Sequence, residues 1–200
     1  MATSRPMTLR ELTREAVRAR IADVAVDLFA EHGFEQVTVE QVAEAAGISA
    51  RSFNRYFATK EDAVVGDPAD WGAFVCDAVQ GRPRDESAWI SLYEAFASLL
   101  VEAGIGGDQH KRVMRVINST PSLQARNLEK HLLWARMLIP LVAERLGGVD
   151  AALRAEALVL ASLSCFDLAL TAWARNEETR SPSDLLEISF STLGLPRQHG

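Results

Sequence analysis

Apolar residues recur every three to four positions along most of the chain, and the runs rich in valine or isoleucine do not alternate as strands would. This period predicts an all-α protein of about nine helices. The expected helices span, in chain order, about 11–32, 38–46, 49–57, 59–79, 86–103, 109–118, 121–146, 150–175 and 181–193. Gly66-Asp67-Pro68 interrupts the fourth of them, which is therefore either kinked or split at that point.

The first expected helix carries an apolar stripe formed by Val17, Ile21, Val24 and Leu28, with Ala25 and Phe29 beside it. Gly33 is a natural residue to end this helix. We expect this stripe to face the core of a small N-terminal domain.

Helix-starting residues precede the second and third helices. Thr38, with Gln41 three residues later, matches a capping box, and Ser49 is a good N-cap. Gly47 lies at the corner between the two short helices. Two short helices joined by a glycine turn form a helix-turn-helix. Residues 11–60 are therefore predicted to be a three-helix DNA-binding domain.

Charge is unevenly distributed along the chain. The formal net charge is −6, yet residues 1–60 contain eight Lys or Arg and eight Asp or Glu, so the whole deficit lies in residues 61–200. Five arginines within the first 20 residues face only Glu11 and Glu15. A locally basic end on an acidic body suits a protein that offers one end to nucleic acid.

The third helix has the side chains of a groove-reading surface. With Phe53 placed inward, Arg51 and Arg55 project to the opposite side, and Ser52 and Asn54 lie on the flanks. Arginine suits guanine, asparagine suits adenine, and serine suits bases or phosphates. The same spacing also fits an ordinary solvated face, and the pattern alone leaves both interpretations open.

Four further residues are candidates for contacts with the DNA backbone. The helix N-termini at Thr38 and Ser49 offer N–H groups to phosphates, and Lys60 adds a cation. Tyr56 either packs its ring against the first helix or gives its hydroxyl to a phosphate.

Residues 38–64 read TVEQVAEAAGISARSFNRYFATKEDAV, and residues 28–34 read LFAEHGF. With the preceding helix they resemble the signature of the tetracycline-repressor (TetR) family over roughly residues 11–64. The resemblance implies a DNA-binding regulator, most commonly a repressor. It places DNA contacts at Thr38, Arg51, Ser52, Asn54, Tyr56 and Lys60. The family usually has Tyr or Phe where this chain has Asn54, so we expect a different contact there.

The C-terminal part resembles a branch of that family whose C-terminal domain is described as binding acyl-CoA-like ligands. Residues 115–126 and the alanine-rich helix after Asp150 carry this resemblance. It implies a helical ligand-binding and dimerisation domain over residues 61–195 and a small, acyl-type effector. Large apolar side chains with a few polar groups would line its pocket: Trp89, Tyr93, Phe96, Met114, Asn118, Trp134, Met137, Cys165, Phe166 and Trp173. Each of these alone is more typical of an ordinary core.

The last two helices carry more apolar residues than one buried face needs: Leu158, Leu160, Leu163, Leu168, Leu170, Leu185, Ile188 and Phe190. A second buried face implies a partner, which the resemblance makes a two-fold homodimer. Such a dimer places two recognition helices about 34–36 Å apart, for a palindromic operator.

Several classes of protein are disfavoured. We expect a soluble cytoplasmic protein with no membrane contact, because no window approaches 18 uncharged apolar residues and the N-terminus lacks the apolar stretch of a signal peptide. Cys76 and Cys165 are isolated, and the four histidines fit no catalytic or metal motif. The sequence thus indicates no metal, no cofactor and no enzyme. The remaining alternative is a helical protein-interaction module without DNA binding.

Overall fold

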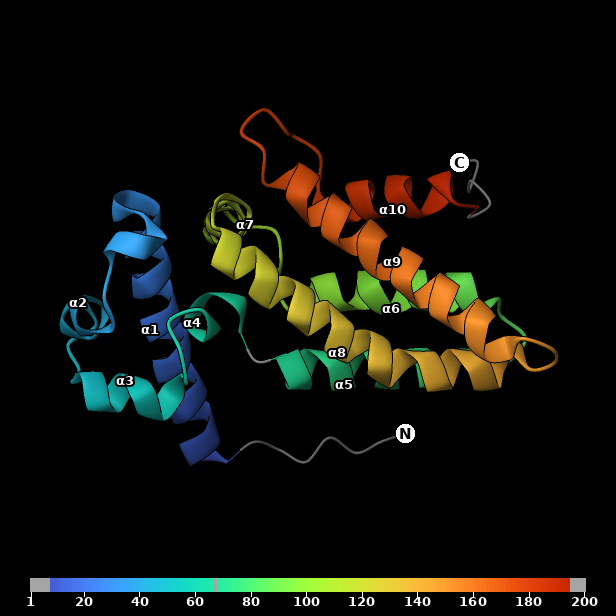
Figure 1. Cartoon of the computed structure of the whole chain (residues 1–200), viewed down its shortest axis with the longest axis horizontal. Coiled ribbons are helices and arrows are strands. Elements are labelled where there is room, and N and C mark those ends of the chain that lie inside the picture. Colours follow the sequence, from blue (N-terminus) through green and yellow to red (C-terminus); the bar gives the residue numbers. More distant parts are fainter. Residues whose placement is uncertain (1–7, 67, 195–200) are drawn as a thin grey trace. The chain divides into compact units, whose positions relative to one another are not determined.

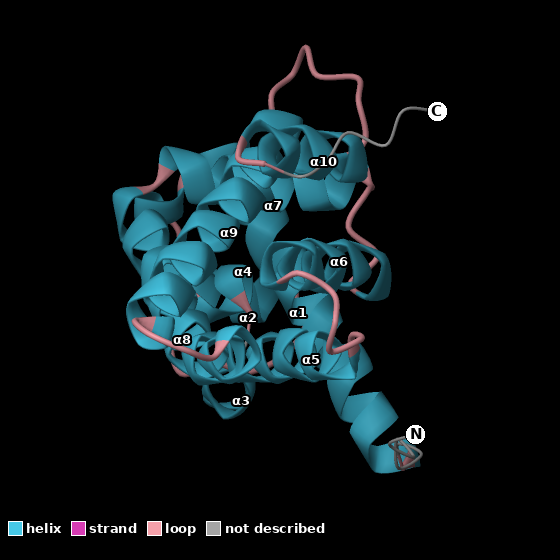
Figure 2. Ribbon diagram, turned by 90° about the vertical axis from the view of Figure 1, so that its right-hand side faces the viewer, coloured by secondary structure: helices cyan, strands magenta, loops and turns pink. Residues whose placement is uncertain are grey.

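The computed structural model describes residues 8–66 and 68–194, and every regular element in these residues is a helix (Figures 1 and 2). The prediction of an all-α fold is therefore confirmed. By its internal contacts the chain divides into two compact units, Met1–Gly66 and Asp67–Gly200, called here the N-terminal and C-terminal units.

The N-terminal unit is a small helical domain built on one long helix. Its elements are α1 (Leu9–His32), the 3₁₀ helix η1 (Phe34–Gln36), α2 (Val39–Ala45), α3 (Ala50–Tyr56) and α4 (Asp62–Val65). Helix α1 packs against η1, α2 and α4, and α2 packs against α3. Its core includes the buried side chains of Ile21, Ala25, Phe29, Phe34, Val42, Phe53 and Phe57.

The buried face of α1 differs slightly from the predicted stripe. Ile21 is buried as expected, but Val17, Val24 and Leu28 are only half-buried. Ala25 and Phe29 complete the buried face, because the small alanine lets neighbouring helices approach while the Phe29 ring meets Phe34 edge-on, with ring centroids 4.8 Å apart.

The fourth predicted helix is split into two. Helix α4 ends before Gly66, whose φ of 77° lies in the left-handed region, and α5 begins at Pro68. The described residues therefore contain ten α-helices rather than about nine.

The described residues of the C-terminal unit form a bundle of six helices: α5 (Pro68–Gly81), α6 (Ala88–Glu102), α7 (Asp108–Ser119), α8 (Pro121–Leu146), α9 (Ala151–Trp173) and α10 (Pro182–Thr192). Helix α8 contacts α5 and α9, and α9 in turn contacts α10 (Figure 1). Helix α8 continues through Pro140 as one element.

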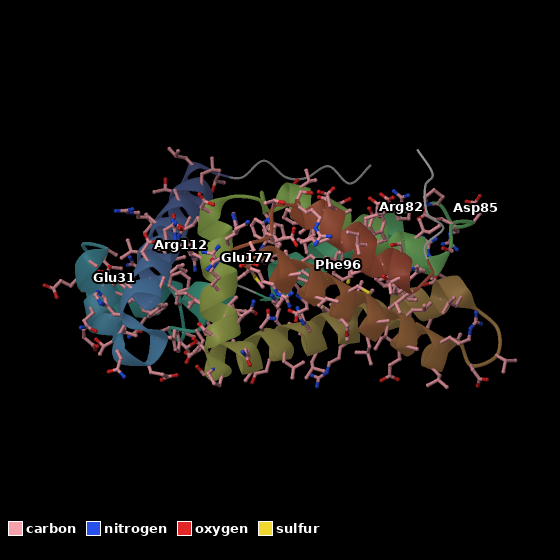
Figure 3. The ribbon with its side chains drawn as sticks, turned by 90° about the horizontal axis from the view of Figure 1, so that it is seen from above. Glu31, Arg82, Asp85, Phe96, Arg112 and Glu177 are labelled. Atoms are coloured by element: carbon pink, nitrogen blue, oxygen red, sulfur yellow. The ribbon has the colours of Figure 1, made fainter. Side chains whose placement is uncertain are left out.

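Aromatic rings fill the centre of this bundle. Phe96, labelled among the helices in Figure 3, stacks on Phe166 with ring centroids 4.9 Å apart and on Trp134 at 6.4 Å. Gly72 of α5 permits this packing, since a Cβ at that position would lie 2.8 Å from Cδ1 of Trp134. The close contact between α5 and α8 thus depends on a glycine.

Helix α9 is long and apolar enough by composition to cross a membrane, and 44% of its most apolar window is buried inside the bundle. A core helix of a helical bundle passes the same test, and α9 contacts α6, α7, α8 and α10. Its hydrophobicity is therefore accounted for in part by packing inside this unit.

Candidate nucleic-acid interface

The turn between α2 and α3 is closed by a Schellman motif. The amide of Ile48 donates to the carbonyl of Ala43 at 2.9 Å, and that of Gly47 donates to Glu44 at 3.0 Å. Gly47 has a φ of 71°, a left-handed conformation that L side chains rarely adopt. The glycine therefore sets the direction in which α3 leaves α2.

Replacing Gly47 by alanine is expected to lower the free energy of unfolding by about 1 kcal/mol, because the built Cβ meets no atom within 4 Å and only backbone strain remains. Gly81→Ala is the matched control, since Gly81 lies in helix α5, has equally open surroundings and lacks a positive φ. Denaturant unfolding of both variants measures the difference. Equal stabilities would contradict a strained turn.

Both predicted N-caps are present. The Thr38 hydroxyl accepts from the amide of Gln41 at 3.3 Å, and the Gln41 side chain accepts from the Thr38 amide at 2.8 Å, which completes the capping box. The Ser49 hydroxyl accepts from the amide of Ser52 at 3.1 Å. Thr38 and Ser49 are exposed, so the starts of both helices are open to solvent.

Helix α3 presents the two faces that the sequence predicts. Phe53 is fully buried, whereas Arg51, Asn54 and Arg55 are exposed. The two flanking polar residues, Ser52 and Tyr56, are half-buried.

The exposed face of α3 is also cationic. The Arg55 guanidinium lies 5.4 Å from the centre of the Tyr56 ring, which supports it beside the helix. Residues 45–60 contain Arg51, Arg55 and Lys60 and no acidic residue. This face therefore suits an anionic polymer with hydrogen-bonding groups in a groove.

The Lys60 ammonium makes contacts within the N-terminal unit. Its ammonium donates to the carbonyls of Phe34 at 2.8 Å and Val37 at 3.3 Å, and it lies 4.2 Å from the centre of the Phe34 ring. Lys60 thus holds the segment that leads into Thr38. Sequence reasoning missed this role, because the two carbonyls are 23 and 26 residues away along the chain.

Arg18 is a second residue whose position the sequence did not indicate. Arg18 belongs to α1, and its guanidinium lies 5.4 Å from the centre of the ring of Phe57, the residue that follows α3. The four-residue spacing of Arg10, Arg14 and Arg18 on one helix was the available signal, because such residues share a face.

The candidate pocket residues are largely packed into the C-terminal core. Five are buried: Phe96, Trp134, Cys165, Phe166 and Trp173. Four are partly buried against the same core: Trp89, Tyr93, Met114 and Met137. Asn118, the tenth, lines one of the surface hollows. The structure thus gathers most of the set around one cluster of rings, where an effector would have to displace packed side chains.

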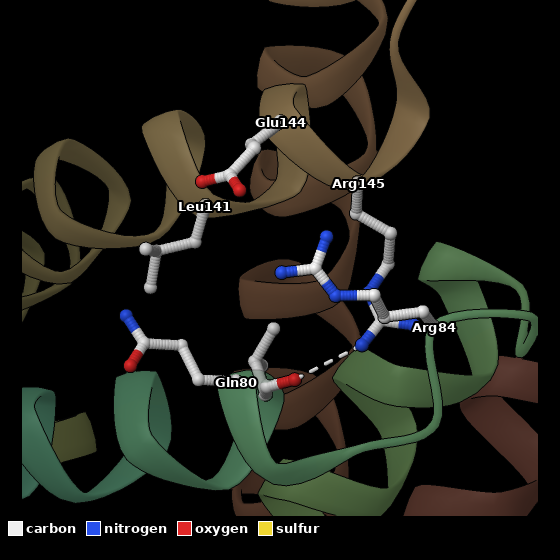
Figure 4. A pocket seen from close by; sticks show the side chains of 6 residues that line it. Gln80, Arg84, Leu141, Glu144 and Arg145 are labelled. Carbon is white, nitrogen blue, oxygen red and sulfur yellow. Dashed lines mark hydrogen bonds between the residues drawn. The ribbon is translucent and has the colours of Figure 1, made fainter.

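A hollow of about 430 Å³ lies between α5 and α8, lined in part by Gln80, Arg84, Leu141 and Glu144 (Figure 4). Arg145 also lines this hollow, but its guanidinium is already hydrogen-bonded to backbone carbonyls.

Arg145 anchors the loop between α5 and α6. Its guanidinium donates to the carbonyls of Val79, Arg82, Pro83 and Glu86 at 2.5–3.2 Å. Arg145 therefore stabilises the conformation of this loop.

A polar cluster lies at the contact of α8 and α9. The Asn127 amide donates to the Asp167 carboxylate at 2.9 Å, and the Lys130 ammonium lies 5.3 Å from the centre of the Trp134 ring. Burial lowers the pKa of Lys130 to about 8 against the opposing effect of Asp167. Burial, followed by repulsion from Lys130, lowers the pKa of His131 to about 4. Asp167, the charged residue within the otherwise uncharged stretch 157–173 of α9, was the signal that could have indicated this cluster.

The lowered pKa of His131 predicts a loss of stability in mild acid. Between pH 6.5 and 4 the unfolded chain takes up a proton at His131 that the folded protein refuses, so the free energy of unfolding falls as pH falls. Between pH 7 and pH 5, His131 should lower the free energy of unfolding by about 2 kcal/mol. Denaturant unfolding of His131→Gln at both pH values should show a correspondingly smaller loss than the wild type. The same loss in both proteins would exclude this role.

Within residues 8–66 and 68–194 no group of three or more His, Cys, Asp or Glu side chains could hold a metal ion. Cys76 and Cys165 are free and buried, and burial is the main cause that raises the pKa of each thiol.

Two family models match this chain. Residues 21–64 match the family model described as bacterial regulatory proteins, tetR family, and residues 86–197 match the one described as MftR C-terminal domain. The chain belongs to the TetR family of bacterial regulatory proteins. It is therefore a transcriptional regulator with a DNA-binding helix-turn-helix.

Two curated relatives are similar over much of their length. A protein of Mycobacterium tuberculosis named as the mycofactocin biosynthesis transcriptional regulator MftR is 30% identical over 187 residues, which cover 90% of this chain and 91% of that protein. The HTH-type transcriptional regulator TcmR of Streptomyces glaucescens is 30% identical over 148 residues, covering 71% of this chain and 65% of TcmR. These relatives are regulators, not enzymes.

Among solved structures, the TetR-family transcriptional repressor FadR of Thermus thermophilus, in complex with lauroyl-CoA, matches with a TM-score of 0.54 and 23% identity. The match covers 91% of this chain and 97% of FadR. It shows that the two chains share a fold. TetR-family regulators bind DNA operators and small-molecule ligands and act as dimers.

Proposed function

We propose that this TetR-family regulator is a ligand-responsive repressor, which binds a palindromic operator as a homodimer and leaves it when a small effector binds. The observation that carries the proposal is the exposed, acid-free face of α3, held at a fixed angle by the capped turn at Gly47. Because the relatives are bacterial regulators, we expect the protein to act in the cytoplasm.

In this proposal some residues of the N-terminal unit contact the bases of the DNA and others contact its backbone. Arg51, Asn54 and Arg55, the exposed side chains of α3, reach base edges in the major groove. The backbone contacts come from Thr38, Ser49, Ser52 and Tyr56, near the helix starts or on the half-buried flank. Lys60 supports Thr38 through the two carbonyls it binds, and its third N–H donor is left for a phosphate.

The proposed dimer interface lies on the outer face of α9 and α10. Of the apolar residues that the sequence indicated, Leu160, Leu168 and Ile188 are exposed, with 43%, 57% and 47% of their surfaces accessible. Leu163, Leu170, Leu185 and Phe190 instead belong to the core of their own unit. Leu153 adds a further exposed leucine to α9. A stripe of this kind is stabilised by a second copy.

For the effector we propose a small molecule with an apolar, acyl-type body. Support comes from the match to the MftR C-terminal domain and from the lauroyl-CoA held by the similarly folded FadR. The effector would enter beside the rings of Phe96, Trp134 and Phe166. It lowers operator affinity only by as much as it prefers the DNA-free arrangement.

Binding to DNA from the chain's own upstream region tests the proposal. Fluorescence anisotropy at several salt concentrations should show tight, sequence-selective binding that weakens steeply with salt, and footprinting should show two half-sites about one helical turn apart. Lauroyl-CoA, as an acyl probe, should weaken that binding. Salt-insensitive binding, or no protected site in genomic footprinting, would instead favour a helical protein-interaction module.

A further inference from the structure

A hollow of about 360 Å³ lies between the C-terminal half of α7 and the C-terminal end of α9. Its lining includes Arg115, Asn118 and Ser119 from α7, Thr171 from α9, and Arg175 just after it. The lining contains two arginines and no carboxylate. It is therefore a cationic hollow on the surface of the C-terminal unit.

Two acceptors of this hollow, the Ala174 carbonyl and Oδ1 of Asn118, are already engaged. Nε of Arg115 donates to the carbonyl of Ala174 at 2.8 Å, which holds the guanidinium in place. The Thr171 hydroxyl donates to Oδ1 of Asn118 at 3.4 Å, which leaves the Asn118 NH₂ group as a donor. The hollow thus offers the remaining guanidinium N–H groups and the Asn118 NH₂ group to a ligand as hydrogen-bond donors.

Arg175 is the residue that packing does not explain. It is exposed, and its side chain makes no hydrogen bond or ion pair with any residue in 8–66 or 68–194. Arg115 caps the end of α9 through Nε alone, and Lys111 donates to the carbonyl of Glu178 in the segment after α9 at 3.1 Å. Capping of α9 therefore accounts for one nitrogen of Arg115 and for nothing on Arg175.

Two other hollows differ in composition. The one between α5 and α8 contains Glu144, and its Arg145 is engaged with four carbonyls. The one in the N-terminal unit contains Glu44. Of these three, the hollow at α7 and α9 is the one suited to an anion.

We propose that this hollow binds an oxyanion, the carboxylate or phosphate group of a small molecule, between Arg115 and Arg175 with the Asn118 NH₂ as a third donor. Guanidinium groups match the paired oxygens of both anions. The identification of the ligand as the effector rests on the proposed function. Anion binding itself does not, and it is measured without DNA.

Thermal unfolding of the full chain with sodium phosphate, sodium acetate or sodium chloride at equal ionic strength tests this site. Phosphate or acetate should raise Tm in a saturable manner beyond chloride. A response to phosphate points to a phosphate ester, and a response to acetate points to a carboxylate. No response beyond chloride overturns the proposal, whatever the outcome of the DNA-binding assay.

Variants distinguish a built site from general charge effects. Arg175→Gln should weaken the apparent anion affinity at least about tenfold, because a charge-assisted bond is lost at a side chain that supports no other contact. Arg115→Gln should do the same, although it also removes the bond to Ala174. Arg136→Gln, which removes an exposed arginine from α8, should respond like the wild type. Equal responses in Arg175→Gln and Arg136→Gln overturn the proposal.

Discussion

The double variant Arg51→Ala/Arg55→Ala is expected to bind operator DNA at least about 100-fold more weakly than the wild type. Both side chains are exposed on α3, opposite the buried Phe53. Each well-made contact between arginine and guanine is worth roughly 1–3 kcal/mol, so losing two removes most sequence selectivity. Fluorescence anisotropy on operator and unrelated DNA of equal length measures both effects.

The matched control is Arg84→Ala/Arg136→Ala, which removes two exposed arginines from the C-terminal unit and changes the net charge equally. It should bind operator with nearly wild-type affinity. Unfolding curves of both variants should superimpose on the wild type, because neither pair contributes to the core. Operator binding that survives in Arg51→Ala/Arg55→Ala would show that α3 does not read the bases.

Leu160→Glu is expected to convert a dimer into a monomer and to weaken operator binding by roughly 100-fold or more. A carboxylate placed in an apolar interface costs several kcal/mol unless it is paired. A monomer also loses the second half-site and the effective concentration that it provides. Light scattering gives the mass, and anisotropy gives the affinity.

Leu132→Glu is the control for this experiment. Leu132 of α8 has 46% of its surface exposed against 43% for Leu160 of α9, so the two substitutions place the same charge on equally exposed leucines. Only Leu160 lies on the proposed interface, and Leu132→Glu should remain dimeric. Two variants of the same mass, or a wild type that is monomeric, would rule out dimerisation through α9 and α10.

Local chemistry explains why much of the DNA-binding unit could be predicted from sequence. Thr38 with Gln41, Gly47 and Ser49 act through hydrogen bonds that span five residues or fewer, and the structure contains all of them. The face of α3 follows from the helical period once Phe53 points inward. The family signature lies in this same segment, which contains the capping residues and the glycine turn.

Contacts distant along the chain were decided only by tertiary structure. The role of Lys60 depends on carbonyls more than 20 residues away. The helical period places an apolar residue on one face of its helix, but it does not tell which neighbouring element covers that face. Leu163 and Leu160 were therefore equivalent in the sequence, yet one is core and the other is exposed.

The sequence by itself determined the all-helical class, the capped helix-turn-helix and the family, because each rests on short-range periodicity, capping or a contiguous signature. The tertiary structure decided the aromatic centre around Phe96, the polar cluster at Lys130 and His131, and the cationic hollow at Arg115 and Arg175. Each of these joins residues that are far apart in the chain and belong to different helices, and only packing selects which helix faces meet.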